Sequence, residues 1–201
     1  MNPILVIATN NLKKGREMAT FLDDLLFELK YLTDFPPQPE VEEIGASYLE
    51  NATLKAVAAA KATGCLAIAD DAGLEIDALN GAPGLYSRRF AGEDTPWPEK
   101  MSQLLNLLRD VPEAKRTCRF HCAISIAGPD GHVQHAEGIC EGRIAYEMKG
   151  SYGFGYDPIF LLPKRGLHMA ELPPAEKNLI SHRAQAMKVA REILKSLRAE
   201  L

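Results

Sequence analysis

The sequence lacks the features that mark secreted, membrane and repeat proteins. Its first residues, MNPILVIATNN, carry no positively charged start and too short an apolar run for a secretory signal peptide. No apolar stretch reaches the length that crosses a membrane, and no internal repeat indicates a solenoid. We therefore expect a cytoplasmic protein without a membrane partner.

Cysteine and positive charge are also scarce. The cysteines at 65, 118, 122 and 140 form no CxxC pair. They are expected to be buried, reduced thiols rather than a metal site with His121. Twenty-three Lys and Arg residues against 27 Asp and Glu residues give a net charge of −4, which argues against a general nucleic-acid-binding surface.

The two most common phosphate-binding motifs are absent as well. The chain contains no GxxxxGK[ST] loop, and no GxGxxG stretch opens a helix. The glycine-rich GFGYDP precedes an expected strand, so it is not a dinucleotide-binding turn. These absences exclude a P-loop or Rossmann phosphate site.

What remains is a soluble composition with alternating elements. The chain has 201 residues, of which 46% are hydrophobic. Strands and helices alternate early and a hairpin follows, which predicts an α/β fold with a mixed, twisted central β-sheet flanked by helices. We expect one domain over residues 1–201, with two lobes around an active-site cleft. The patterns predict strands over 3–8, 29–32, 65–69, 117–127, 132–137 and 139–146, and helices from residue 12 to 26, over 48–63, over 97–108 and over 181–199.

The stretch ATNNLKK, from Ala8 to Lys14, joins the first strand to the first helix. Backbone amides at a helix start bind phosphate, and Lys13 or Lys14 adds positive charge. An ordinary N-cap with solvated lysines explains the same residues. The segment is therefore either a phosphate site or a simple cap.

Carboxylates gather on both sides of the expected helix over 48–63. Glu40, Glu42 and Glu43 precede it, and Asp70 and Asp71 end the next strand. A strand that runs back beside this helix brings residue 71 near residue 43. Converging carboxylates suit Mg²⁺, which takes one or two of them plus phosphate oxygens and water. The alternative is a turn-capping aspartate with solvated glutamates.

Two further groups of cations stand out. Asn51 and Lys55 are four residues apart and share one face of an alanine-rich helix. Lys55 either projects into a site or extends along the surface to solvent. Arg88 and Arg89 follow a Pro-Gly turn, which presents at least one guanidinium from a fixed backbone.

An aromatic group and a basic group complete the candidate site. Phe154 and Tyr156 are separated by a glycine, so they offer a flat stacking surface that a ligand can approach closely. Lys177, His182 and Arg183 lie near the start of the last expected helix. Positive charge opposes the helix dipole there, and this unfavourable placement indicates a function.

These residues resemble the inosine triphosphate pyrophosphatase family, also called dITP/XTP pyrophosphatases or the Ham1-like family. The resemblance rests on TNNLKK, ENATLKA, ADDAGL, GAPGLYSRRF, FGYDPIF and SHR, in that order, and covers essentially the whole chain. It implies hydrolysis of ITP, dITP and XTP to the monophosphate plus pyrophosphate, which cleanses the nucleotide pool. It also implies a Mg²⁺ cofactor and a homodimer.

The resemblance assigns roles residue by residue. It implies that Asp71 is a metal ligand and the proton acceptor, and that Glu43 is the second metal ligand. It implies that Asp70 supports the site without binding the metal directly. It also implies that Phe154 stacks on the purine and that the polar edge of the purine is read by Asp157, Lys177, His182 and Arg183. The triphosphate is neutralised by Lys14, Lys55 and Arg89. The implied substrate-binding residues are Thr9, Asn10, Asn11, Leu12, Lys13, Lys14, Lys55, Ala72, Arg89, Phe154, Gly155, Tyr156, Asp157, Lys177, His182 and Arg183.

The chain departs from the family pattern at two positions. Ala72 stands where the family has serine, which removes a hydroxyl contact, and Arg88 replaces a small residue. Three other interpretations compete with the family's activity. The chain is alternatively a pyrophosphatase for modified pyrimidine nucleotides, a nucleotide-binding regulator without turnover, or a structural protein that leaves the polar clusters unexplained.

Overall fold

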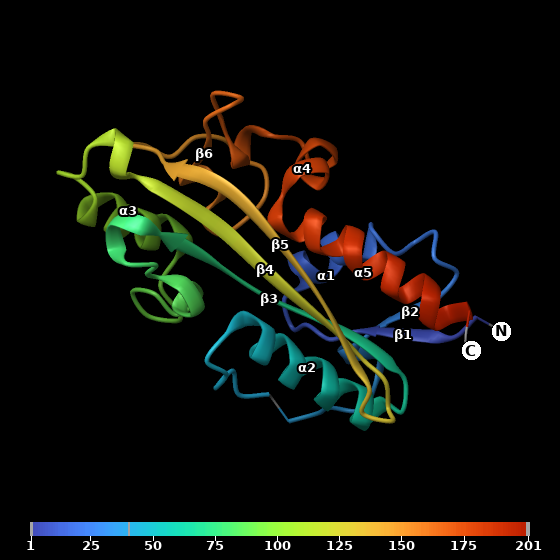
Figure 1. The fold of residues 1–201 in the computed structure, drawn as a ribbon. Coiled ribbons are helices and arrows are strands. Elements are labelled where there is room, and N and C mark those ends of the chain that lie inside the picture. Colours follow the sequence, from blue (N-terminus) through green and yellow to red (C-terminus); the bar gives the residue numbers. More distant parts are fainter. Residues whose placement is uncertain (1, 40, 200–201) are drawn as a thin grey trace. The chain divides into compact units, whose positions relative to one another are not determined.

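The computed structural model describes residues 2–39 and 41–199, so Glu40 lies outside the described residues. Its strands are β1 (Ile4–Ile7), β2 (Glu28–Tyr31), β3 (Leu66–Ile76), β4 (Thr117–Ala127), β5 (Val133–Ile144), β6 (Phe160–Leu162) and β7 (Leu167–His168). Its helices are α1 (Leu12–Ala19), α2 (Tyr48–Thr63), α3 (Trp97–Leu107), α4 (Pro174–Ile180) and α5 (His182–Ala199) (Figure 1).

The strands form a mixed sheet, as the sequence predicts. Their order is β2-β1-β3-β4-β5-β6-β7. Strand β1 pairs in parallel with β2 and β3, whereas β6 pairs antiparallel with β5 and β7. The fold is therefore α/β, with its parallel part at the N-terminal end of the chain.

Two compact units divide the chain. The first unit comprises Met1–Asp71, Cys122–Gly138 and Arg183–Leu201, and the second comprises Ala72–His121 and Ile139–His182. Strands β3, β4 and β5 each begin in one unit and end in the other. The boundary in β3 falls directly after Asp71.

In the first unit, helices cover both faces of the parallel strands. Helix α1 lies on the crossover from β1 to β2, and α2 lies on the crossover from β2 past β1 to β3. The two crossovers run in opposite directions along the sheet, so right-handed connections place α1 and α2 on opposite faces. Helix α5 lies on the face of α1 (Figure 1). The alanines of α2 allow close contact with β1 and β3, and the shared cluster comprises Val6, Ala8, Ala56, Ala59, Ala60, Ala67, Ala69 and Ala127.

The second unit has its own apolar core. Leu74 and Ile76 of β3 pack with Leu104 of α3, and all three are fully buried. Phe120 and Phe160 stack there with ring centroids 4.3 Å apart. Gly142 permits this packing, because a Cβ at residue 142 would lie 2.4 Å from the Phe160 ring.

Helix α2 begins and ends as its sequence predicts. The Ser47 hydroxyl accepts a hydrogen bond from the amide of Glu50 at 3.1 Å. The Glu50 carboxylate accepts a hydrogen bond from the amide of Ala46 at 2.7 Å. In a capping box it would instead accept from the amide of the N-cap residue, Ser47. Gly64 ends the helix in the left-handed region, at φ 67°.

The structure corrects four sequence predictions. Helix α1 ends at Ala19 rather than Leu26, and Leu26 adopts a φ of 56°, which a continuing helix does not allow. Strand β3 continues through the two aspartates to Ile76, so they lie inside a strand instead of ending one. Residues 133–144 form one strand rather than two, and Lys177 belongs to the separate helix α4.

Within residues 2–39 and 41–199, no helix is long and apolar enough to cross a membrane. All four cysteines are free thiols, as expected, and only Cys65 is not buried. Burial raises the pKa of Cys122 to about 12 and that of Cys140 to about 11, and it also raises the pKa of Cys118.

We predict that alkylation at pH 8 modifies Cys65 first. A rise in pKa from 9.0 to about 11 lowers the thiolate fraction of Cys140 by about a hundredfold, and burial blocks access as well. Mass spectrometry of iodoacetamide-treated native protein should show the other three thiols reacting at least tenfold more slowly. Denatured protein, in which all four react alike, is the control. Equal native rates for Cys65 and Cys122 would contradict the buried packing.

Candidate active site

The two aspartates of β3 face opposite sides of the sheet, because successive side chains in a strand alternate. Asp71 lies on the side of α2, where the Asn51 amide donates to its Oδ2 at 3.1 Å. Asp70 contacts Arg183 of α5 and Lys14 of α1 instead. The adjacent carboxylates are tolerated because each one has its own group of partners.

Asp70 is held by two cations. Arg183 donates to its Oδ2 through Nε at 3.1 Å and Nη2 at 2.8 Å, and Lys14 Nζ lies 3.4 Å from the same oxygen. Burial by itself would raise the pKa of Asp70, but the charges of Lys14 and Arg183 lower it well below its usual range. Its Oδ1 is buried without a hydrogen-bond partner among the described residues.

Arg183 is itself bound on a second side. Its Nη1 lies 2.8 Å from Glu17 Oε2, and the residue is only 1% exposed. The two acids outweigh the effect of burial and raise the pKa of Arg183. Three of its nitrogens thus contact carboxylates, which places this residue in a buried ion-pair network.

Asp71 and Glu43 meet at one lysine. Lys55 Nζ lies 2.7 Å from Glu43 Oε1 and 3.7 Å from Asp71 Oδ1. Burial raises the pKa of Asp71, and Glu43 adds to the rise, while Lys55 and Lys14 oppose it. The structure therefore brings residues 43 and 71 to the same place, as the spacing of strand and helix predicts.

The turn before α1 has the geometry of an N-cap. Asn11 Oδ1 accepts hydrogen bonds from the amides of Lys13 and Lys14 at 3.1 and 3.2 Å. Thr9 Oγ1 accepts from the amide of Asn11 at 3.1 Å. These amides are already bonded within the chain, so any phosphate binding here falls chiefly to side chains such as Lys14.

In the second unit, Asp157 organises the glycine-rich loop. Its Oδ2 binds Lys177 Nζ at 2.6 Å and the amide of Phe154 at 2.9 Å. The Lys177 ammonium also lies 4.8 Å from the centre of the Phe154 ring. Gly153 is required at φ 73°, because a Cβ there would lie 2.1 Å from the Asp157 carboxylate. Phe154, Asp157 and Lys177 thus form one cluster.

The remaining predicted residues of this unit differ in exposure. Tyr156 is buried, and its hydroxyl donates to the Ser87 carbonyl at 2.9 Å, so of the two aromatics only Phe154 is partly exposed. His182 is buried and stacks on Phe120 with ring centroids 4.8 Å apart. Arg89 is exposed, with its guanidinium 5.4 Å from the centre of the Tyr86 ring.

Sequence reasoning missed the partners that hold these groups. Glu17 carries no signal beyond its place in a polar helix face. The spacing of Asn51 and Lys55 shows a shared face but not the contact of Asn51 with Asp71. Lys100 of the second unit is a buried residue outside every motif, and Ser87, also buried, lies in GAPGLYSRRF but had no predicted role.

The donor set on α2's side of β3 fits a magnesium ion bound together with phosphate. No group of three or more His, Cys, Asp or Glu side chains within residues 2–39 and 41–199 is arranged to hold a metal. Mg²⁺ usually takes one or two carboxylates and completes its shell with phosphate oxygens and waters. Glu43 and Asp71 place two carboxylates, whose hard oxygen donors suit Mg²⁺, on this side of the strand, where Lys55 Nζ contacts both.

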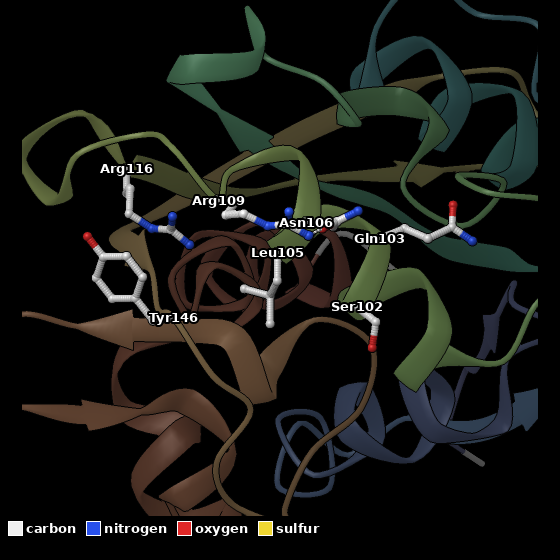
Figure 2. Close-up of a pocket in the computed structure, with 7 residues that line it drawn as sticks. All are labelled: Ser102, Gln103, Leu105, Asn106, Arg109, Arg116 and Tyr146. Carbon is white, nitrogen blue, oxygen red and sulfur yellow. Dashed lines mark hydrogen bonds between the residues drawn. The ribbon is translucent and has the colours of Figure 1, made fainter.

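A hollow of about 630 Å³ in the second unit contains none of the predicted site residues. It lies beside α3, and Figure 2 shows the Tyr146 ring next to Arg116. The guanidinium of Arg116 lies 4.2 Å from the centre of that ring and donates to the carbonyls of Leu108, Ile144 and Ala145. Arg116 is thus a structural cation of the core.

The mixed sheet, together with the polar clusters around Asp71 and around Asp157, is typical of an α/β protein that handles phosphorylated substrates. The chain belongs to the Ham1 family, whose sequence model matches residues 5–193. It is 51% identical over 193 residues to the dITP/XTP pyrophosphatase of Desulforamulus reducens, which covers 96% of each chain. It is 49% identical over 183 residues to that of Geobacillus kaustophilus, covering 91% of this chain and 90% of the relative.

Solved structures of the family have the same fold. A HAM1 protein from Coxiella burnetii is 41% identical, with a TM-score of 0.89 over 98% of this chain and 100% of that one. The Staphylococcus aureus Ham1 protein is 40% identical, with a TM-score of 0.87 over 96% and 99% of the two chains.

We predict that Arg183→Met lowers the free energy of unfolding by about 3–5 kcal/mol, because it leaves the buried Asp70 without its main partner. Urea denaturation measures the loss. Adding Asp70→Asn should recover part of it. Arg165→Met, which removes the exposed pair of Arg165 with Glu176, should cost less than about 1 kcal/mol. Equal small losses for both arginines would show that the buried network does not stabilise the fold.

Proposed function

We propose that the chain hydrolyses ITP, dITP and XTP to the nucleoside monophosphate and pyrophosphate. The observation that carries this proposal is that Lys55 Nζ contacts the carboxylates of both Glu43 and Asp71. The names of the relatives, dITP/XTP pyrophosphatases, support the same activity. Removal of deaminated purine nucleotides cleanses the nucleotide pool, and we place this activity in the cytoplasm.

The first unit binds the triphosphate. Glu43 and Asp71 hold Mg²⁺, which when bound supplies positive charge to the phosphates and the leaving pyrophosphate. Asp71 accepts the proton of the water that attacks the α-phosphate. In the metal-free protein, burial raises the pKa of this carboxyl group, and Glu43 adds to the rise.

Cations of the site have different tasks. Lys14 is partly exposed and is available to phosphate, although it also lies 3.4 Å from Asp70. Lys55 holds Glu43 and Asp71 together, and its burial is outweighed by their charges, which raise its pKa and keep it protonated. Arg89 is exposed in the second unit and adds a further charge for the triphosphate.

The second unit recognises the base. Phe154 stacks on the purine, and Lys177, oriented by Asp157, donates to the oxygen at purine C6. His182 lies on the Phe120 ring and supplies a second donor. Arg183 was expected to read the base as well, and this stays a prediction, but its contacts favour the task of holding Asp70.

The resemblance supports two further parts of the proposal. The enzyme acts as a homodimer, and its partner is the nucleotide rather than a nucleic acid, in keeping with the net charge of −4. A regulator without turnover is less well supported, because pure binding does not require a proton acceptor and a metal site together, the roles proposed for Asp71 and Glu43.

We predict that pyrophosphate release is fastest with ITP, dITP and XTP and at least about a hundredfold slower with ATP. The amino group at adenine C6 would leave the donors of Lys177 and His182 unpaired. GTP should also be poor, for reasons of shape that these donors do not explain. Chelation of Mg²⁺ should abolish turnover, and adding it back should restore turnover. Equal rates for ITP and ATP, or a preference for pyrimidines, would refute the assignment.

We predict that Asp71→Asn lowers kcat with ITP by about a hundredfold or more, since it removes both the proton acceptor and a metal ligand. Binding of the triphosphate should weaken much less. Asp110→Asn, at an exposed position after α3, is the matched control and should leave kcat unchanged. Steady-state kinetics of pyrophosphate release measure both. Near-native turnover of Asp71→Asn would rule out this mechanism.

A further inference from the structure

Lys100 of α3 is a buried cation whose bonds go to the backbone. The residue is only 1% exposed, and fully buried lysines are rare unless they have partners. Its Nζ donates to the carbonyls of Arg88, Gly92 at 2.7 Å and Glu93 at 3.4 Å. The three donors of one ammonium thus hold three carbonyls of a single six-residue segment.

The residue before this segment is fixed independently. The Ser87 hydroxyl donates to the Gly84 carbonyl at 2.6 Å and accepts from the amide of Leu74 in β3 at 2.9 Å. The Ser87 carbonyl accepts from the buried Tyr156 hydroxyl at 2.9 Å. Trp97 of α3 packs edge-on against Tyr156, with centroids 5.1 Å apart. The start of the segment is therefore tied to β3 and to the glycine-rich loop.

The backbone inside the segment is strained. Ala91 adopts a φ of 59°, in the left-handed region that residues with a Cβ seldom occupy. Such a conformation persists only where its surroundings hold it. Thr95 Oγ1 donates to the Ala91 carbonyl at 2.6 Å, and the lysine holds the carbonyls on both sides.

The exposed charged side chains of this segment are Arg88, Arg89 and Glu93. Arg88 pairs with Glu93 at 3.2 Å, on the outside of the turn, while Arg89 lies over the Tyr86 ring. A backbone held from three directions, with an exposed guanidinium at its centre, is suited to presenting that group in one orientation.

We propose that Lys100 is a positioning residue for Arg89. Its ammonium fixes the carbonyls of residues 88, 92 and 93, and so holds the backbone that carries the Arg89 guanidinium in one conformation before substrate binds. This inference rests on the proposed function, in which Arg89 binds phosphate. The hydrogen bonds of Lys100 Nζ go to carbonyls of the segment, so the role proposed for this residue is positioning rather than contact with substrate.

The kinetic test uses Lys100→Met, which keeps the length of the side chain and removes the ammonium. It should raise KM for ITP by about tenfold while kcat changes less than about threefold, because a misplaced Arg89 weakens binding of the triphosphate. Lys115→Met, at an exposed lysine of the same unit, is the control and should change neither value. An unchanged KM in Lys100→Met would overturn the inference.

A double-mutant cycle separates positioning from general stability. In an Arg89→Ala background, Lys100→Met should add less than about twofold to KM, because the group it positions is gone. If the two effects multiply instead, the lysine does not act through Arg89. Where Lys100→Met does not fold, Lys100→Arg serves in the same cycle, since a planar guanidinium does not reproduce the three-carbonyl geometry of an ammonium.

Hydrogen exchange of the substrate-free protein gives a readout that does not depend on activity. Amides of residues 88–95 should exchange at least about tenfold faster in Lys100→Met than in wild type or Lys115→Met, while those of α2 stay unchanged. Unchanged exchange at 88–95 would overturn the inference whatever the activity. If exchange is faster in Lys100→Met but the wild-type protein does not hydrolyse ITP, the proposed function is refuted. The positioning of Arg89 for a triphosphate is then refuted as well, and only the role of Lys100 in holding residues 88–93 stands.

Discussion

The two-residue alternation of β3 is the constraint on which the first unit depends. It directs Asp71 to the side of α2 and Asp70 to the side of α1 and α5, so neighbouring carboxylates never compete for one set of partners. One acid then meets Asn51 and Lys55, while the other meets Lys14 and Arg183. A bulge or a slip of one residue in this strand would exchange the two environments and destroy both.

The same alternation explains the opposite electrostatics of the pair. Asp70 is buried among cations, which lower its pKa, and it stays ionised as an anchor for Arg183 and Lys14. Burial raises the pKa of Asp71, and its acidic neighbour Glu43 adds to the rise. Adjacent positions in the chain thus have distinct chemical tasks because of what packs on each face of the sheet.

Buried polar residues play a comparable supporting part in the second unit. Asp157 fixes Lys177 and the backbone of Phe154, and Lys100 fixes the carbonyls around Arg89. The hydrogen bonds of Asp157 Oδ2 and Lys100 Nζ go to other groups of the protein. These hydrogen bonds offset the cost of desolvating buried charged side chains and restrict the backbone that they hold.

By itself, the sequence determined the α/β class, the limits of α2, the buried thiols and the set of polar clusters, because these follow from local periodicity, caps and the order of motifs. It did not determine the continuation of β3 through Asp70 and Asp71, the early end of α1, or the contacts of Arg183 with Asp70 and Glu17, which lie 113 and 166 residues away in the chain. Those features depend on which elements pack together, since burial and partner charges decide whether an aspartate continues a strand or an arginine faces a ligand. Only the tertiary structure brings such distant residues within hydrogen-bond distance.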